Sequence, residues 1–281
     1  MSVAAAKIEA PYKAGFFTRE RLDSFLPPFI GLAVGAILWQ VIATIWNQEF
    51  FPPITDVIRR LGELTEQGKI LSNLVTSLTN LAIGFSFSVI VGVTLGMLMG
   101  AFRKVEMALD VYVYAMLTSP SLVFAPIFFA IFGLKNIQYT ILGLIILYSI
   151  WIIVVNTAAA IRTVPIALIE MGRSYCATER QLFFKIILPA SMPMVFAGIR
   201  LGMGRAVKGM INGEMFIIAV GLGGVAKAEG QRFNADGVLA VLLVIIIVAM
   251  VMQKLVQLLD ARVTSWLPST ARQGKRRANA D

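Results

Sequence analysis

Long apolar runs dominate this sequence. Five of them contain no charged residue: residues 24–48, 70–102, 111–134, 136–161 and 237–253. A sixth, roughly 194–220, is apolar apart from Arg200, Arg205, Lys208 and Glu214. A membrane-spanning helix needs about 20 mainly apolar residues, and the 17 residues of 237–253 are at the short end of that range. The pattern therefore predicts an all-α membrane protein with six transmembrane helices.

The distribution of Lys and Arg predicts the orientation of these spans. With the N-terminus in the cytoplasm, sixteen cations lie inside, in residues 1–25, 103–104, 162–185 and from 254 onward, and six lie outside. Because cytoplasmic loops carry the excess of Lys and Arg, we expect both termini inside. The predicted organisation is a cytoplasmic segment 1–25, a single transmembrane domain 26–260 and a basic cytoplasmic tail 261–281, which lies beside anionic lipid headgroups.

Composition limits the chemistry. The chain is 58% apolar and 15% charged, whereas a soluble domain is about half apolar and a quarter charged. The net charge of +9 could indicate nucleic acid, but the cations lie in short clusters between apolar runs, so the expected partner is the lipid bilayer. One cysteine and no histidine exclude an internal disulfide, a Cys/His metal cluster and a His-based triad. We expect no enzyme activity, no metal and no cofactor.

Two inter-span loops have features of their own. Residues 50–68 contain Pro52 and Pro53 and then Thr55 or Asp56 as helix N-cap candidates. Apolar residues follow at helical spacing, namely Val57, Ile58, Leu61 and Leu64. This loop predicts an amphipathic helix on the outer membrane surface. The other loop, 162–193, is the longest predicted cytoplasmic connection between spans.

The cytoplasmic loop contains the sequence Glu170-Met-Gly-Arg-Ser-Tyr-Cys-Ala-Thr-Glu-Arg-Gln-Leu-Phe-Phe-Lys-Ile-Ile-Leu-Pro189. It resembles the signature of ABC importer permeases, in which E-A-A, three residues, G, nine residues and I-x-L-P form a helix–turn–helix gripped by the ATPase. The spacing is kept in full, with matches at Glu170, Ile186, Leu188 and Pro189. Met171 and Gly172 replace two alanines, and Cys176 replaces the glycine.

The resemblance implies that this loop passes rigid-body motion of an ATPase to the spans. The implied coupling residues are Glu170, Met171, Gly172, Cys176, Ala177, Thr178, Ile186, Leu188 and Pro189. Glycine gives the family's turn a permissive backbone. Because Cys176 has a Cβ, either the turn avoids positive φ here or the interface differs. The alternative interpretation of the loop is a basic cytoplasmic connection without a partner.

Further stretches resemble permeases of the nitrate, sulfonate and taurine importer group. They include Phe51-Pro-Pro-Ile-Thr-Asp-Val, Ser119-Pro-Ser-Leu-Val-Phe-Ala-Pro-Ile, Gly198-Ile-Arg-Leu and a Gly221-Leu-Gly-Gly turn, so the likeness covers roughly residues 50–266. It implies a multi-pass permease of the bacterial inner membrane for a small, anionic solute. The implied partners are a second permease copy, two ATP-binding cassette ATPases and an external solute-binding protein.

Two other classes of protein are compatible with long apolar runs. The chain has no G-x-x-x-x-G-K-[ST] phosphate loop, so ATP is bound by a separate subunit. An ion-coupled secondary transporter is the alternative, but such proteins usually keep several acidic groups in their helices. Here Glu214 is the only acid well inside a predicted span, and no internal repeat is evident. A membrane-embedded enzyme ranks third.

The charges of the fifth predicted span are candidates for the translocation pathway. Arg200 lies near its inner end and can snorkel to the surface. Arg205 and Lys208 are three residues apart and share a helix face near the midplane, whereas Glu214 points to the opposite side. One interpretation is that Arg205 and Lys208 attract an anionic solute. The other, given equal weight, is that they pair with polar groups or headgroups.

Small residues and prolines mark the second and third spans. Gly84, Gly92, Gly96 and Gly100 let another helix approach closely, and packing within one subunit is favoured over a dimer seam. Pro120 and Pro126 predict a kinked or interrupted third span. Irregular backbone at membrane depth is tolerated beside protein or a water-filled cavity. Residues 118–127 are therefore a candidate pathway wall. The predicted pathway set is Ser119, Pro120, Pro126, Arg205, Lys208 and Glu214.

Overall fold

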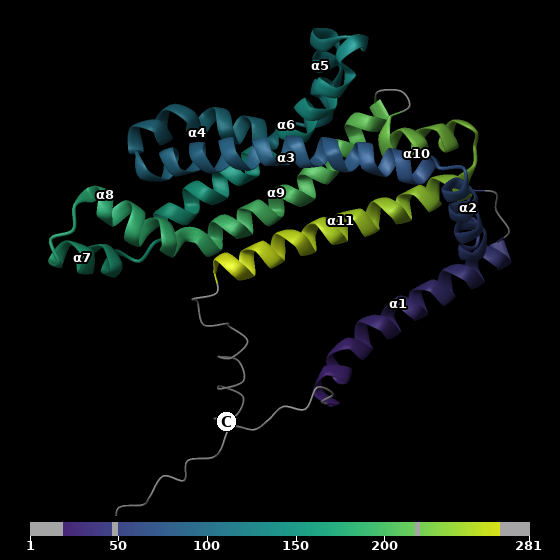
Figure 1. Cartoon of the computed structure of the whole chain (residues 1–281), viewed down its shortest axis with the longest axis horizontal. Helices are drawn as coiled ribbons and strands as arrows, with labels where there is room; N and C mark the ends of the chain where they lie inside the picture. The colour runs from purple at the N-terminus through teal and green to yellow at the C-terminus, as the bar shows by residue number, and fades with distance from the viewer. Residues whose placement is uncertain (1–18, 47–49, 217–219, 265–281) are drawn as a thin grey trace, which may run out of the picture.

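The structure is a computed structural model that describes residues 19–46, 50–216 and 220–264. Within these ranges every regular element is helical (Figure 1). The elements are α1 (Arg19–Trp46), α2 (Ile54–Glu66), α3 (Lys69–Ala101), α4 (Arg103–Thr118), η1 (Ser121–Phe124), α5 (Ala125–Phe132), η2 (Leu134–Asn136), α6 (Ile137–Arg162), α7 (Ile166–Ser174), α8 (Glu179–Leu182), η3 (Phe183–Ile187), α9 (Leu188–Phe216), α10 (Gly221–Gln231) and α11 (Ala235–Val263).

The described helices confirm an all-α membrane protein. Four of them are long and apolar enough to cross a membrane: α3, α6, α11 and the continuous rod from α8 to α9. The pair formed by α4 and η1–α5 is bent by 96° and is either a fifth, broken span or a re-entrant loop. The apolar part of α1, Ile30–Trp46, is shorter. The sixth span and the cytoplasmic placing of both termini therefore stay predictions.

The predicted interruption of the third span is present, and it has one cause rather than two. Ser119 leaves the helix with ψ 140° and Pro120 follows with ψ 96°, so the chain is extended between α4 and η1. Pro126 lies in the first turn of α5, where a missing N–H costs nothing. Only Pro120 interrupts the span.

Helix α6 forms the centre of the bundle, and α3 packs along one side of it. A Cβ added to any of four α3 glycines would lie 2.5–3.0 Å from an α6 side chain. The pairs are Gly84 on Ile145, Gly92 on Ile153, Gly96 on Thr157 and Gly100 on Ile161. The favoured prediction for this stripe, packing within one subunit, is therefore confirmed.

A second glycine stripe, which was not predicted, packs α9 onto the other side of α6. Its members are Gly198 on Asn156, Gly202 on Ile153, Gly209 on Leu144 and Tyr148, and Gly213 on Ile141. An added Cβ would lie 2.5–3.3 Å from these neighbours. Two glycine faces thus enclose the bulky residues of α6, and close helix approach of this kind supplies the packing that lipid cannot.

Helix α2 is amphipathic as predicted, but it packs on the bundle. Val57 and Leu64 are fully buried in a cluster with residues of α10 and α11, Leu61 lies partly buried at its edge, and Ile58 is exposed. The N-cap is Pro53, so the prediction of Thr55 or Asp56 was wrong. Pro53 has an extended backbone and immediately precedes the first helical residue. Asp56 lies in the first turn, where the positive end of the helix dipole stabilises a carboxylate.

Helix α1 diverges from the bundle (Figure 1). It is held near its end, where Trp39 Nε1 donates to the Pro52 carbonyl at 3.1 Å and the Trp39 ring stacks on Phe51. Most of its large apolar side chains from Ile30 to Trp46 are exposed, so lipid or another protein must cover them.

The predicted domain limits shift slightly at both ends. Helix α1 begins at Arg19, inside the segment 1–25, and α11 continues to Val263, past residue 260. Residues 1–18, and 265–281 of the predicted basic tail, lie outside the described residues.

Candidate functional site

The predicted coupling loop is a helix–turn–helix at one end of the bundle (Figure 1). Pro165 precedes α7, and α8 continues through a single π-helical turn, η3, into α9. Thr178 begins α8 with a capping box: its N–H donates to Gln181 Oε1 at 2.9 Å, and the Gln181 N–H donates to Thr178 Oγ1 at 3.4 Å. The spacing Thr-x-x-Gln could have revealed this helix start from sequence.

The turn between α7 and α8 keeps a left-handed backbone at Cys176, with φ 53°. Hydrogen bonds define it: the Cys176 N–H donates to Arg173 O at 2.9 Å, and the Ala177 N–H donates to Gly172 O at 3.1 Å. Of the two alternatives that the sequence left open, avoidance of positive φ is therefore wrong. Cysteine adopts the conformation that the resembling family assigns to glycine, at a cost of about 1–2 kcal/mol.

Gly172 allows α7 to pack closely against α8 and η3. It is buried, and an added Cβ would lie 2.5 Å from Ile186 Cδ1 and 2.7 Å from Leu182 Cδ2. Leu182 is 1% exposed. A glycine in place of the second alanine of the signature thus brings α7 close to η3, and α8–η3–α9 forms a continuous rod behind it.

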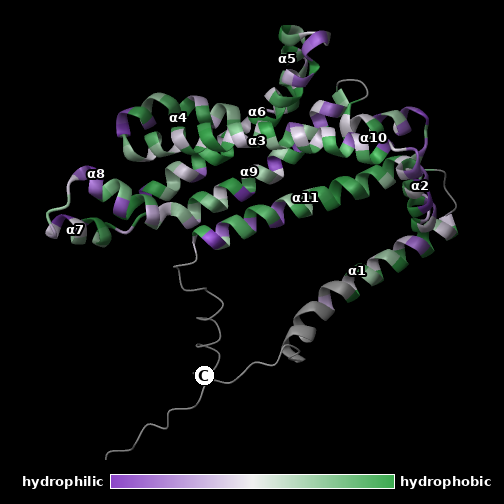
Figure 2. Cartoon of the chain, viewed as in Figure 1, coloured by the Kyte–Doolittle hydropathy of each residue, from purple (hydrophilic) through white to green (hydrophobic). Residues whose placement is uncertain are grey.

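The outward side of the loop is exposed. Met171 is 50%, Phe184 63% and Tyr175 83% exposed. The Glu170 carboxylate is also exposed, and it pairs with no other group in residues 19–46, 50–216 and 220–264. Figure 2 shows hydrophilic residues gathered on α7 and α8 beside the green, apolar helices of the bundle. This surface of mixed polar and large apolar groups suits a protein partner.

Charged residues near the C-terminal ends of α6 and α11 are paired. Arg200 Nη2 lies 3.5 Å from Asp260 Oδ2 on α11, so it has a protein partner rather than only the snorkelling position expected from sequence. Arg162 pairs with Glu106 and donates to the Met99 carbonyl. These pairs fasten α9 to α11 and α6 to α4.

Arg205 and Lys208 lie on the exposed face of α9. Neither makes an ion pair or side-chain hydrogen bond with the residues that the structure describes. One turn along the same helix, Asn212 Nδ2 donates to the Tyr148 hydroxyl of α6 at 2.7 Å. The structure thus leaves two exposed cations on the apolar helix α9 open to another molecule.

Glu214 is on the opposite side of α9 and fully buried. Its Oε1 accepts a hydrogen bond from Ser77 at 2.7 Å, its Oε2 accepts one from the Gly223 N–H at 2.9 Å, and the Leu222 N–H donates to Ser77 at 2.9 Å. The Glu214 carboxylate and the Ser77 hydroxyl therefore each accept a hydrogen bond from one of the first N–H groups of α10, as N-cap side chains would. The expected Gly221 turn is instead the start of this helix, with φ 73° at Gly221.

The remaining pathway candidates do not join Arg205 and Lys208 within one chain. Ser119, Pro120 and Pro126 lie at the bend between α4 and α5, and those helices pack on α6 rather than on α9. Within the described segments no group of three or more Cys, Asp or Glu residues could hold a metal ion.

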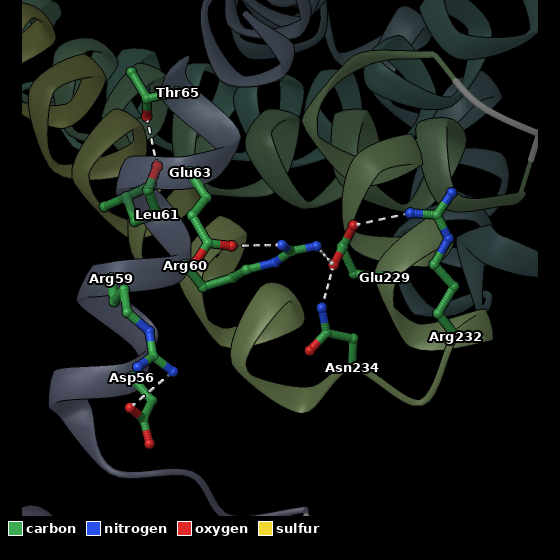
Figure 3. Close-up of polar contacts among 9 residues, drawn as sticks. All are labelled: Asp56, Arg59, Arg60, Leu61, Glu63, Thr65, Glu229, Arg232 and Asn234. Carbon is green, nitrogen blue, oxygen red and sulfur yellow. Dashed lines mark hydrogen bonds and ion pairs between the residues drawn. The ribbon is translucent and has the colours of Figure 1, made fainter. Parts of the chain in front are cut away.

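A polar network ties the other end of the bundle together (Figure 3). Glu229 of α10 is 2% exposed, and its Oε2 accepts from Arg60 Nη2 of α2 at 2.9 Å and from Asn234 Nδ2 at 2.6 Å. Arg60 also pairs with Glu63 at 2.7 Å, and Arg232 lies 3.6 Å from Glu229 Oε1. Burial alone raises the pKa of Glu229, but hydrogen bonds from Arg60 and Asn234 and the charges of Arg60 and Arg232 outweigh it and hold that pKa below 4.5. No local sequence signal predicts this network, because Arg60 and Glu229 are 169 positions apart.

Comparison with known proteins identifies the class. Residues 92–265 match the family "Binding-protein-dependent transport system inner membrane component", and the chain belongs to this family. It is the permease component of a binding-protein-dependent ABC importer. This assignment decides against the ion-coupled secondary transporter.

Similar proteins include three importer permeases. The chain is 30% identical over 206 residues to the nitrate import permease protein NrtB of Synechocystis sp., covering 70% of this chain and 74% of the relative. It is 29% identical to the bicarbonate transport system permease protein CmpB of the same organism, covering 80% and 84%. It is 28% identical to the putative aliphatic sulfonates transport permease protein SsuC of Bacillus subtilis, covering 83% and 85%.

A solved structure shares the fold. The inward-facing MetNI methionine ABC transporter superposes with a TM-score of 0.59 at 19% identity, covering 69% of this chain and 96% of that one.

Proposed function

We propose that this chain forms the translocation pathway of an importer for a small oxyanion. The relatives are named for nitrate, bicarbonate and aliphatic sulfonates, and all three solutes are anions. The single observation that carries the proposal is the pair Arg205 and Lys208, two exposed cations on one face of α9 without an ion-pair partner among the described residues. A desolvated cation attracts an anion far more strongly than one in water.

The assembly we propose has two copies of this permease in the bacterial inner membrane, with both termini in the cytoplasm. Two ATPase subunits bind residues 170–189 from the cytoplasm, and a solute-binding protein delivers the anion from outside. The exposed outward side of α7 and α8 supports the ATPase contact. The exposed face of α9 lines the pathway between the copies, and Ser119, Pro120 and Pro126 form part of its wall. Glu214 takes part by holding α9 to α10.

The test is uptake of labelled nitrate, bicarbonate and ethanesulfonate by cells that co-express the chain with its cognate ATPase and solute-binding protein. Wild type should accumulate at least one of the three. Lys208→Met, which keeps the volume of the side chain, should lower that uptake about tenfold, equivalent to the loss of roughly 1.4 kcal/mol of attraction.

Lys254→Met is the matched control, because Lys254 is another exposed lysine, near the far end of α11, without an ion pair in the described part of the chain. It should transport like wild type. No uptake of any of the three anions would reject the proposed function. If Lys208→Met instead loses its ATPase or its second copy, the cation supports assembly rather than solute attraction.

A further inference from the structure

A cavity lies at the end of the bundle opposite the coupling loop, between the first turns of α6 and the first half of α3. Its volume is about 410 Å³. The polar residues that line it are Thr76, Thr79, Asn80, Lys135 and Gln138, and no Asp or Glu is among the lining residues. Its apolar residues are Val75, Ile137, Ile141 and Val220. The cavity is therefore electropositive, with one apolar side.

Two amide side chains connect the walls of the cavity. Asn80 of α3 is 2% exposed, and its Oδ1 accepts a hydrogen bond from Gln138 Nε2 of α6 at 3.2 Å. The amide nitrogen of Asn80 donates to no acceptor among the described residues. This nitrogen is not one of the fully buried, unpartnered atoms of the described residues, so it is open to the cavity and can donate to a ligand acceptor there.

Positive charge comes from Lys135 and from the start of α6. Lys135 forms no ion pair with any group in residues 19–46, 50–216 and 220–264. It precedes a helix of 26 residues whose N-cap, Asn136, makes no side-chain capping bond. The first N–H groups of such a helix lack intrahelical partners and carry the positive end of its dipole. A cation, free helical N–H groups and an amide N–H together recognise an oxyanion. The Thr76 and Thr79 hydroxyls do not contribute donors, because they already donate to the Ser72 and Val75 carbonyls.

We propose that this cavity is a binding site for a small oxyanion, separate from Arg205 and Lys208 on α9. The proposal rests on the proposed function and deepens it by giving the solute a first site at the outer end of the permease. The apolar side formed by Val75, Ile137 and Ile141 accommodates a short alkyl group. The site therefore suits an alkanesulfonate as well as an inorganic oxyanion.

Thermal melting of the purified permease–ATPase complex, without the solute-binding protein, tests the site. Chloride is replaced by nitrate, bicarbonate or ethanesulfonate at constant ionic strength. At least one of the three should raise the Tm of wild type by about 2 °C. The shift should disappear in Lys135→Gln. It should persist in Lys69→Gln, since Lys69 is an exposed lysine at the same end that does not line the cavity.

A second experiment restores the positive charge at position 135 chemically. It distinguishes loss of the charge from loss of folding in the variant. In a Cys176→Ser background, Lys135→Cys is the only thiol in the chain. Reaction with 2-aminoethyl methanethiosulfonate should restore the cation and the anion-dependent Tm shift, and reaction with the sulfonatoethyl reagent should not. A shift that survives in Lys135→Gln, equal rescue by both reagents, or no shift in wild type with any anion would overturn the site. Uptake by wild-type cells without such a shift would reject this site and leave the proposed function intact.

Discussion

The two ends of the bundle differ in how deeply their charged residues are buried. At the end formed by α2, α10 and α11, Arg60 and Glu229 are paired inside the chain (Figure 3). Glu229 is 2% exposed. At the other end, the outward side of α7 and α8 leaves Glu170 without an ion pair among the described residues and Tyr175 83% exposed. One end buries its main ion pair, whereas the other leaves large side chains of α7 and α8 exposed and has its ion pair between Arg173 and Glu179 at the surface.

Because of this difference, substitutions at one end should change the folding stability of the permease, and substitutions at the other end should change its assembly with the ATPase. A buried, hydrogen-bonded ion pair is costly to break, because the remaining charge is left without a partner away from water. Exposed side chains at a future interface contribute little to the folding of the free chain, yet a few of them carry most of the binding energy. Substitutions at the α2–α10 end should therefore unfold the permease, and substitutions on α7 and α8 should release its ATPase.

The largest expected effect is at Arg60. Arg60→Ala leaves the buried Glu229 carboxylate without its main partner and should lower the free energy of unfolding by about 3–5 kcal/mol. Arg59→Ala is the matched control on the neighbouring position, since the Arg59–Asp56 pair is 71% and 40% exposed and contributes about 0–1 kcal/mol. Thermal unfolding of the two variants in the same detergent measures the difference.

Acidification provides a second readout of that pair. The folded-state pKa of Glu229 is held below 4.5, so its contribution to stability is present above that pH and is lost as pH falls through the folded value. The stability gap between wild type and Arg60→Ala should be full at pH 7 and narrow below pH 4.5, because a protonated Glu229 needs no cation. A gap that stays constant would show that Arg60 acts through packing alone.

The same contrast explains what could be predicted from sequence. The loop was recognised because Glu170 and Pro189 belong to one continuous motif, and the interrupted span because Pro120 cannot donate a hydrogen bond. The Arg60–Glu229 pair depends on chain segments 169 positions apart and has no local signal. The position of Glu214 at the start of α10 was missed for a related reason: glycines at 221–224 are typical of a turn, and only the capping carboxylate identifies a helix start.

An effect of intermediate size is expected on the association of the permease with its ATPase. Glu170→Arg should weaken association with the ATPase by about 2 kcal/mol, roughly 30-fold in Kd, and leave the melting temperature of the free permease unchanged. Glu66→Arg makes the same charge change on an exposed residue at the opposite end and should bind the ATPase normally. Co-purification and the melting curve of each variant decide the matter. Equal ATPase recovery from both variants would contradict the coupling role of the loop.

The smallest effect is expected at Cys176, where the left-handed backbone costs about 1–2 kcal/mol for a residue with a Cβ. Cys176→Gly removes that cost. Glycine also increases the conformational entropy of the unfolded chain, which lowers stability by about 0.5–1 kcal/mol. The net effect should be a turn that is more stable by roughly 0.5–1 kcal/mol. Slower hydrogen exchange of the amides of Cys176 and Ala177, which donate to Arg173 and Gly172, measures this gain.

Cys176→Ala is the control, because alanine keeps the Cβ and should give no gain. An equal gain in both variants would show that the thiol, and not the positive φ, is the source of strain. Because φ is already 53° with cysteine, glycine should leave the shape of the turn unchanged. The amount of ATPase that co-purifies with Cys176→Gly should then match wild type, even though the turn is more stable. A change in recovery would mean that the cysteine side chain itself contacts the ATPase, and that the interface differs here from that of permeases with glycine at this position.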